Sequence, residues 1–137
     1  MGVGAALALN VSSSKAEASV LGGTTHIIAN DGGVGGGALS LTSSNNMDAQ
    51  AIASGEAVGE LATAVGVAIA INVADMRNSA SVASGVAVDG HGFSAQAVMK
   101  PVGGDSAHRY AAKATSGAGG DDTETGVAGS FALNIVN

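Results

Sequence analysis

The sequence contains no cysteine and no tryptophan, and it has one proline, one tyrosine and two phenylalanines among 137 residues. Without cysteine, neither a disulfide framework nor a thiolate metal site can form. Because aromatic residues are so scarce, we expect a core built from Ala, Val, Ile and Leu. The 46% apolar content and the near absence of proline are unlike a disordered low-complexity chain.

Positive charge is also scarce, with five Lys and Arg residues against 11 Asp and Glu, a net charge of −6. This balance argues against a nucleic-acid partner and against attachment to anionic lipid. The longest uncharged apolar run, residues 61–74, has about 14 residues, whereas a membrane helix needs roughly 20. We therefore predict neither nucleic-acid binding nor membrane insertion.

What the chain does contain is a repeat. The stretch "GVGAALALNV" at 2–11 returns as "AVGVAIAINV" at 64–73 and as "GVAGSFALNI" at 126–135. Asn10, Asn72 and Asn134 are thus spaced 62 residues apart. A constant, ungapped offset of this kind is typical of a repeat architecture. The same offset aligns two sets of large apolar residues, Leu7, Ile69 and Phe131, and Leu9, Ile71 and Leu133.

A shorter period lies within the repeat. "GVG" at 2–4 returns at 33–35, and "ALAL" at 6–9 returns as "ALSL" at 38–41, which suggests two quasi-repeats of about 31 residues. The match is poorest over 90–120. A division into three coils of about 21 residues remains open, but the two matches favour 31.

Apolar and small residues alternate with a period of two in these stretches, which is typical of β-strands. A helical turn at 56–62 remains an alternative, because Ala favours helix. Ser, Asn and Gly clusters separate the strands as turns. Short strands of this kind bury their apolar faces only by stacking unit on unit. We therefore predict an all-β parallel β-solenoid with about 31-residue coils in a 62-residue double repeat.

The stretches "GVGAALALNV…KAEASV" and "GVAIAINV…NSASV" resemble the repeats of giant bacterial surface adhesins of the filamentous-haemagglutinin-like and leukotoxin-like kind. The resemblance covers most of the chain apart from 90–120. It implies a right-handed parallel β-helix, a cell-surface or secreted parent, and a stalk or adhesive role without catalytic residues. Residues 1–137 would then be one segment of a longer repeat protein, with units of about 2–63 and 64–125 and a partial unit at 126–137.

The three aligned asparagines are candidates for structural positions rather than for ligand binding. We expect Asn10, Asn72 and Asn134 where strands end, in a turn-forming role. Stacked amides can also form ladders, but in a 31-residue coil Thr42 would occupy the intervening position and break the ladder.

Chemically reactive clusters are weakly represented. Asp121, Asp122 and Glu124 follow a glycine run and are the candidates for calcium, although the acidic segment fits a solvated turn better. His26, His91 and His108 fit surface positions better than metal ligation. Arg109 and Lys113 share a strand face, yet the 62-residue offset places them over Met47 and Ala51, which fit inward positions, so a register shift or a bulge is required. No cofactor is predicted.

These observations favour a non-catalytic structural or adhesive segment of a large bacterial surface or secreted fibrous protein, located outside the cell. Enzymatic activity is disfavoured because β-helix lyases and hydrolases need clustered Asp, Arg or Lys on one face. The alternatives are a ligand-binding solenoid face for polysaccharide, host protein or ice, and a self-assembling filament subunit. The predicted partners are a second copy, joined end to end through open edge strands, and a cell-surface glycan or host protein.

Overall fold

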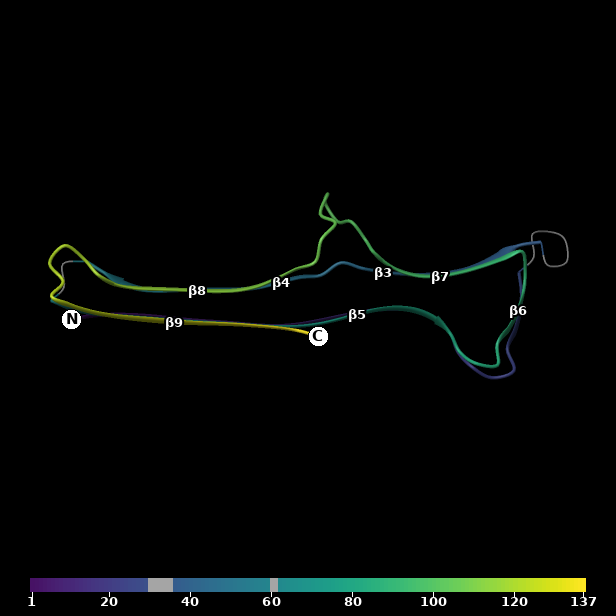
Figure 1. Ribbon diagram of the computed structural model, residues 1–137, viewed down its shortest axis with the longest axis horizontal. Helices are drawn as coiled ribbons and strands as arrows, with labels where there is room; N and C mark the ends of the chain where they lie inside the picture. Colours follow the sequence, from purple (N-terminus) through teal and green to yellow (C-terminus); the bar gives the residue numbers. More distant parts are fainter. Residues whose placement is uncertain (30–35, 60–61) are drawn as a thin grey trace. The chain divides into compact units, whose positions relative to one another are not determined.

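The computed structural model describes residues 1–29, 36–59 and 62–137, and within these residues every regular element is a β-strand (Figure 1). The predicted all-β class is therefore confirmed, and the alternative of a helical turn is wrong where residues 56–58 continue a strand. No described helix is long and apolar enough to cross a membrane. The strands are β1 (Gly2–Val20), β2 (His26–Ile28), β3 (Ala38–Asn45), β4 (Asp48–Val58), β5 (Thr63–Val82), β6 (Ala87–Asp89), β7 (Gly92–Met99), β8 (Arg109–Gly119) and β9 (Thr125–Val136).

The strands form four sheets. One sheet has three strands in the order β1-β5-β9, and the others are the pairs β2-β6, β3-β7 and β4-β8. The registers of β2-β6, β3-β7, β4-β8 and β5-β9 are all parallel. Hydrogen-bonded neighbours thus come from corresponding places in successive repeats, which is why the repeat is visible in the sequence.

The spacing of the paired residues corrects the predicted coil. Asn72 pairs with Asn134, 62 residues further on, and Asp48 pairs with Arg109, 61 further on. In β3-β7 the spacing falls to 54, because Ala38 pairs with Gly92. None of these registers joins residues 31 apart, so the prediction of about 31-residue coils is wrong for the strand pairing described. The second "GVG", at 33–35, lies outside the described residues.

The half-repeat has a different structural meaning. Ser14 on β1 donates a hydrogen bond to the side chain of Asn45 on β3 at 2.9 Å, across 31 residues. The two strands belong to different sheets. We infer that the two halves of the repeat resemble each other because facing sheets need the same alternation of small inward and larger outward residues.

The described residues divide into two compact units. The first consists of 1–13, 48–75 and 108–137, and it contains the β4-β8 pair, β9 and the parts of β1 and β5 that face this pair. The second consists of 14–47 and 76–107, and it contains β2-β6, β3-β7 and the remaining parts of β1 and β5.

The core of the first unit is made of alanine. Ala51, Ala53, Ala68 and Ala70 form its central cluster, with exposed fractions between 0 and 3%. The large aliphatic residues of the same strands point the other way: Ile52 of β4 is 56% exposed and Val67 of β5 is 41% exposed. The expected core of Ala, Val, Ile and Leu is therefore confirmed for Ala and wrong for the larger aliphatic residues of these strands, because the layers lie too close together to admit them.

Glycines set this close approach. A methyl group placed on Gly55 of β4 would collide with the backbone carbonyl of Val67 on β5. It would also lie 3.0 Å from the backbone nitrogen of Ala6 on β1. The backbone of β4 therefore lies at contact distance from the backbones of both β1 and β5. This leaves room only for Ala, Gly, Ser and Asn between the β4-β8 sheet and the β1-β5-β9 sheet.

Candidate functional site

The most organised group of polar side chains is a row of three asparagine amides inside the first unit, which we call the amide ladder (Asn10, Asn72 and Asn134). Asn10 donates from Nδ2 to Oδ1 of Asn72 at 2.7 Å, and Asn72 donates to Oδ1 of Asn134 at 2.8 Å. The middle rung is fully buried, with 0% of Asn72 exposed. The row runs across all three strands of the β1-β5-β9 sheet.

The amide ladder also connects the β1-β5-β9 sheet to the facing β4-β8 sheet. Asn72 Nδ2 donates to the carbonyl oxygen of Ala49 at 3.1 Å, and Asn134 Nδ2 donates to that of Tyr110 at 3.2 Å. Ala49 and Tyr110 are themselves register partners on β4 and β8. Each of these two rungs therefore satisfies a carbonyl of the facing layer, and for the buried Asn72 such a partner is required.

Two expectations about these asparagines are corrected. Asn10 and Asn72 do not lie where strands end, because they stand in the interiors of β1 and β5, whereas Asn134 lies near the end of β9. Thr42 does not interrupt the ladder, because it belongs to β3 and pairs with Gln96 of β7. The ladder forms because paired strands are 62 residues apart and every rung is an asparagine.

A second polar cluster lies inside the second unit. Ser43 and Asn45 are both buried there. Ser43 Oγ donates a hydrogen bond to Asn78 Oδ1 at 2.5 Å, and Asn45 Nδ2 donates to the backbone carbonyl of Arg77 at 3.3 Å. Asn78 in turn donates to the carbonyl of Val98 at 2.7 Å. These contacts crosslink β3, β5 and β7, so they are structural in the same sense as the ladder.

The outer surface of the β1-β5-β9 sheet carries rows of large apolar residues, which we call the outer apolar face. The rows follow the alignment found in the sequence, since Ile69 pairs with Phe131 and Ile71 with Leu133. Exposed fractions are 36% for Ile69 and 54% for Phe131. A contiguous exposed apolar surface of this kind commonly marks an interaction site. Its members are Val3, Leu7, Leu9, Val11, Val65, Val67, Ile69, Ile71, Val73, Val127, Phe131, Leu133 and Ile135.

A hollow of about 520 Å³ opens beside the start of β4 and β8 in the first unit. The Asp48 carboxylate there accepts a hydrogen bond from the backbone nitrogen of Arg109 at 2.8 Å, and the His108 and Tyr110 rings stack with centroids 6.3 Å apart. The hollow thus has one carboxylate, that of Asp48, beside the side chains of His108, Arg109 and Tyr110. Oδ1 of this carboxylate accepts the hydrogen bond that links β4 to β8. Its lining residues are Asp48, Gln50, His108, Arg109, Tyr110 and Ala111.

The structure resolves the conflict over Arg109 and Lys113. The β4-β8 register is 61 rather than 62, so Arg109 pairs with Asp48 and Lys113 with Ile52. Both pairs project outward, and Ile52 is 56% exposed. The alternative of a register shift is therefore confirmed. Paired residues are 61 apart in β4-β8 and again 62 apart in β5-β9. This one-residue difference was not visible in the 62-residue alignment.

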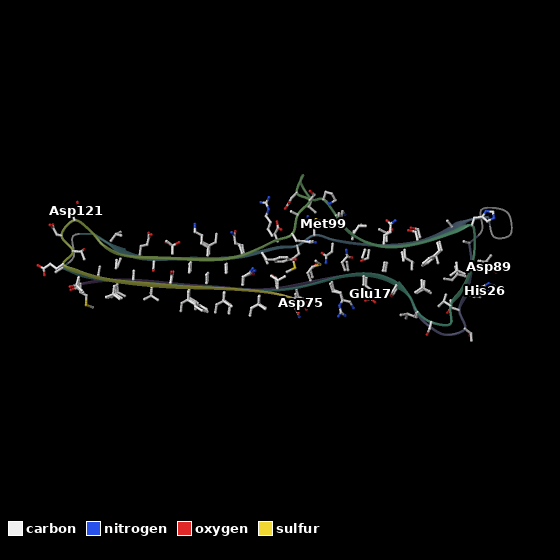
Figure 2. The ribbon with its side chains drawn as sticks, viewed as in Figure 1. Glu17, His26, Asp75, Asp89, Met99 and Asp121 are labelled. Atoms are coloured by element: carbon white, nitrogen blue, oxygen red, sulfur yellow. The ribbon has the colours of Figure 1, made fainter. Side chains whose placement is uncertain are left out.

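The titratable candidates lie apart from one another. His26 contacts Asp89 at 2.7 Å, joining β2 to β6 (Figure 2). The spacing of 63 residues hid this pair from sequence reasoning. Asp121, Asp122 and Glu124 occupy the connection between β8 and β9. Within 1–29, 36–59 and 62–137, no group of three or more His, Asp or Glu residues is placed to hold a metal ion.

One exposed ion pair alters a pKa. The Lys15 ammonium donates to the Glu17 carboxylate at 2.7 Å and lowers the pKa of Glu17 below its ordinary value of 4.5, first through this hydrogen bond and then through its charge. Arg77 and Ser19 act in the same direction, and desolvation opposes them.

We therefore expect Lys15→Met to raise the pKa of Glu17 toward 4.5, measured by NMR titration of the side-chain carboxyl. Because the folded-state pKa is lowered, the pair stabilises the fold above the unfolded-state pKa. That contribution is lost as the pH falls through the folded-state value. Lys113→Met is the control and should leave the Glu17 titration unchanged. An unaltered titration in Lys15→Met would contradict the assigned cause.

These features define an all-β protein of parallel strand ladders with a polar amide row inside and an apolar face outside. No family model, no curated protein and no solved structure matches the chain.

Proposed function

We propose that the chain is a segment of a parallel β-solenoid with a structural or adhesive, non-catalytic role in a large bacterial surface or secreted fibrous protein. The observation that carries the proposal is the amide ladder, whose rungs stand 62 residues apart on three neighbouring strands. A row of mutually bonded amides with a buried middle rung fixes the register of stacked strands, which is a structural task and requires no ligand.

The distribution of chemical groups supports the same proposal. Among the described residues, no group of three or more His, Asp or Glu residues is placed to hold a metal ion, and His26 pairs with the single acid Asp89. Arg109 and Lys113 are two exposed cations on the outside of β8. Acid–base catalysis and metal catalysis both need several such groups converging on one point, and the ladder's amides are committed to one another and to backbone carbonyls.

The outer apolar face favours one alternative, a binding function. Its aliphatic rows fit an apolar protein surface better than a polysaccharide, because glycan recognition draws on polar groups and aromatic platforms, and Phe131 alone supplies an aromatic ring there. Self-association through the edges of β1 and β9, which each have one strand neighbour in the three-stranded sheet, belongs to the structural role.

The location and the role can be tested together. An antibody raised against the purified chain should label intact producing cells without permeabilisation; labelling only after permeabilisation would contradict a surface location. Beads coated with the chain should then be compared with beads coated with a Leu9→Lys, Ile71→Lys variant for attachment to host cells. Equal attachment supports the purely structural role, and attachment at least tenfold lower for the variant supports binding by the outer apolar face.

A further inference from the structure

The inner face of β9 is only partly covered, although the matching face of β5 is buried over residues 64–74. Ala70 of β5 has 0% exposure, whereas its register partner Ala132 of β9 is exposed. The same contrast holds between Ala64 and Gly126. All twelve residues of β9 are exposed. Because paired residues on the two strands point the same way, the difference lies in what faces them and not in their orientation.

The facing sheet explains the contrast. A methyl group on Gly66 of β5 would collide with the Gly117 carbonyl of β8, and it would lie 2.8 Å from the Gly55 carbonyl of β4. The strand β5 therefore lies against both strands of the facing β4-β8 sheet. A methyl group on Gly126 of β9 would lie 2.6 Å from the Ala118 carbonyl of β8. The three atoms nearest to it all belong to Ala118.

The facing β4-β8 sheet has an open edge at β8. Among the described strands, β8 has β4 as its hydrogen-bonded neighbour and none on its other side. The inward residues of β4 are buried, as Ala51 and Ala53 show at 3%, but their neighbours on β8, Ala112 and Ala114, are only partly buried. The free edge of β8 and the partly covered inner face of β9 therefore bound one strip, which we call the acceptor strip.

We propose that the acceptor strip binds an extended peptide strand, parallel to β8, with Ala, Gly or Ser at every second position. The edge of β8 offers backbone donors and acceptors, the usual basis of strand addition. The short distance between layers selects small inward side chains, because the Gly126 position already lies close to a backbone carbonyl. This binding does not depend on a surface or adhesive role for the protein.

The sequence of β4 shows what such a ligand would be. Its sequence is "DAQAIASGEAV", and its buried face carries Ala49, Ala51, Ala53, Gly55 and Ala57. Its outward face carries Asp48 and Glu56, whereas that of β8 carries Arg109 and Lys113. In the register that β4 adopts with β8, the first residue of a second such strand would lie beside Arg109. We infer that the preferred occupant is a further strand of this same repeat pattern.

The test uses the purified full chain and a fluorescein-labelled peptide, DAQAIASGEAV, followed by fluorescence anisotropy. Saturable binding is expected. The chain variant Ala132→Trp should weaken binding at least tenfold, because the indole fills the strip, and the matched variant Phe131→Trp, on the opposite face of β9, should bind like the unmodified chain. Both positions are exposed, so both variants should retain the β-type circular dichroism of the parent.

Two further measurements assign the place of binding. A peptide with Leu at the positions of Ala51 and Ala53 should bind at least tenfold more weakly, and hydrogen exchange should slow at the amides of 109–119. Self-association of the chain that Ala132→Trp abolishes would also support the proposal, since a strand of a second copy then fills the strip. The absence of peptide binding to a monomeric chain, equal binding by Ala132→Trp, or protection confined to β1 would overturn it.

Discussion

Replacing Asn72 with Ala should lower the free energy of unfolding by about 3 kcal/mol, because three polar groups around this buried position lose a bond at once and an unsatisfied buried group costs about 1–3 kcal/mol. The carbonyl oxygen of Ala49 and Oδ1 of Asn134 each lose the donor that Asn72 supplies. Nδ2 of Asn10 loses its shorter bond and keeps Ser12 Oγ at 3.4 Å. Urea denaturation followed by circular dichroism measures the loss. The site is fully buried, so water cannot replace these bonds without opening the layers.

The terminal rungs of the amide ladder are the matched controls. Asn10→Ala and Asn134→Ala each remove one rung-to-rung bond at a solvent-accessible position, and each should cost about 1 kcal/mol. An Asn72→Asp variant should be at least as harmful as Asn72→Ala, because it keeps the shape but buries a charge and cannot donate to Asn134. Equal losses at all three rungs would contradict the buried role of the middle amide.

Replacing Gly55 with Ala should destabilise the fold by about 3 kcal/mol, the upper end of the range for overpacking. The added methyl group would collide with the backbone carbonyl of Val67. A backbone atom within a sheet cannot move aside by a rotamer change, so β4 and β5 must separate. The expected result is a lower urea midpoint for the first unit and, at high temperature, early loss of the β-type spectrum.

Gly129→Ala is the control for this substitution. A methyl group at Gly129 of β9 meets nothing within 4 Å, so the change should lie within about 0.5 kcal/mol of zero. Gly22→Ala would meet the Ala83 side chain and a backbone oxygen at 3.3 Å and should fall between the two. If Gly55→Ala and Gly129→Ala behaved alike, close contact between the layers would not be what holds glycine at position 55.

The alternation of residues along the chain determines much of this protein. Period-two patterns predicted strands, and the 62-residue alignment predicted the partners Ile69 with Phe131, Ile71 with Leu133 and Asn72 with Asn134. Such predictions succeed because neighbours in a parallel ladder must carry matching side chains at matching heights. The alignment failed for β8, where it placed Arg109 over Met47 although Arg109 pairs with Asp48. A one-residue difference between repeats leaves little trace in residues as similar as Ser, Gly and Ala.

Only the tertiary structure decided which face of each strand is the inside. An alternation of Leu with Ala is compatible with either face, and the usual preference for buried leucine pointed to the wrong one. The layers instead meet on the face of Ala, Gly and Asn, at a distance set by backbone contacts at Gly55 and Gly66. At that distance an asparagine can bridge three strands and a leucine cannot fit. The sequence by itself therefore determined the strands and most of their pairing, whereas the separation of the layers decided the core, the amide ladder and the apolar surface.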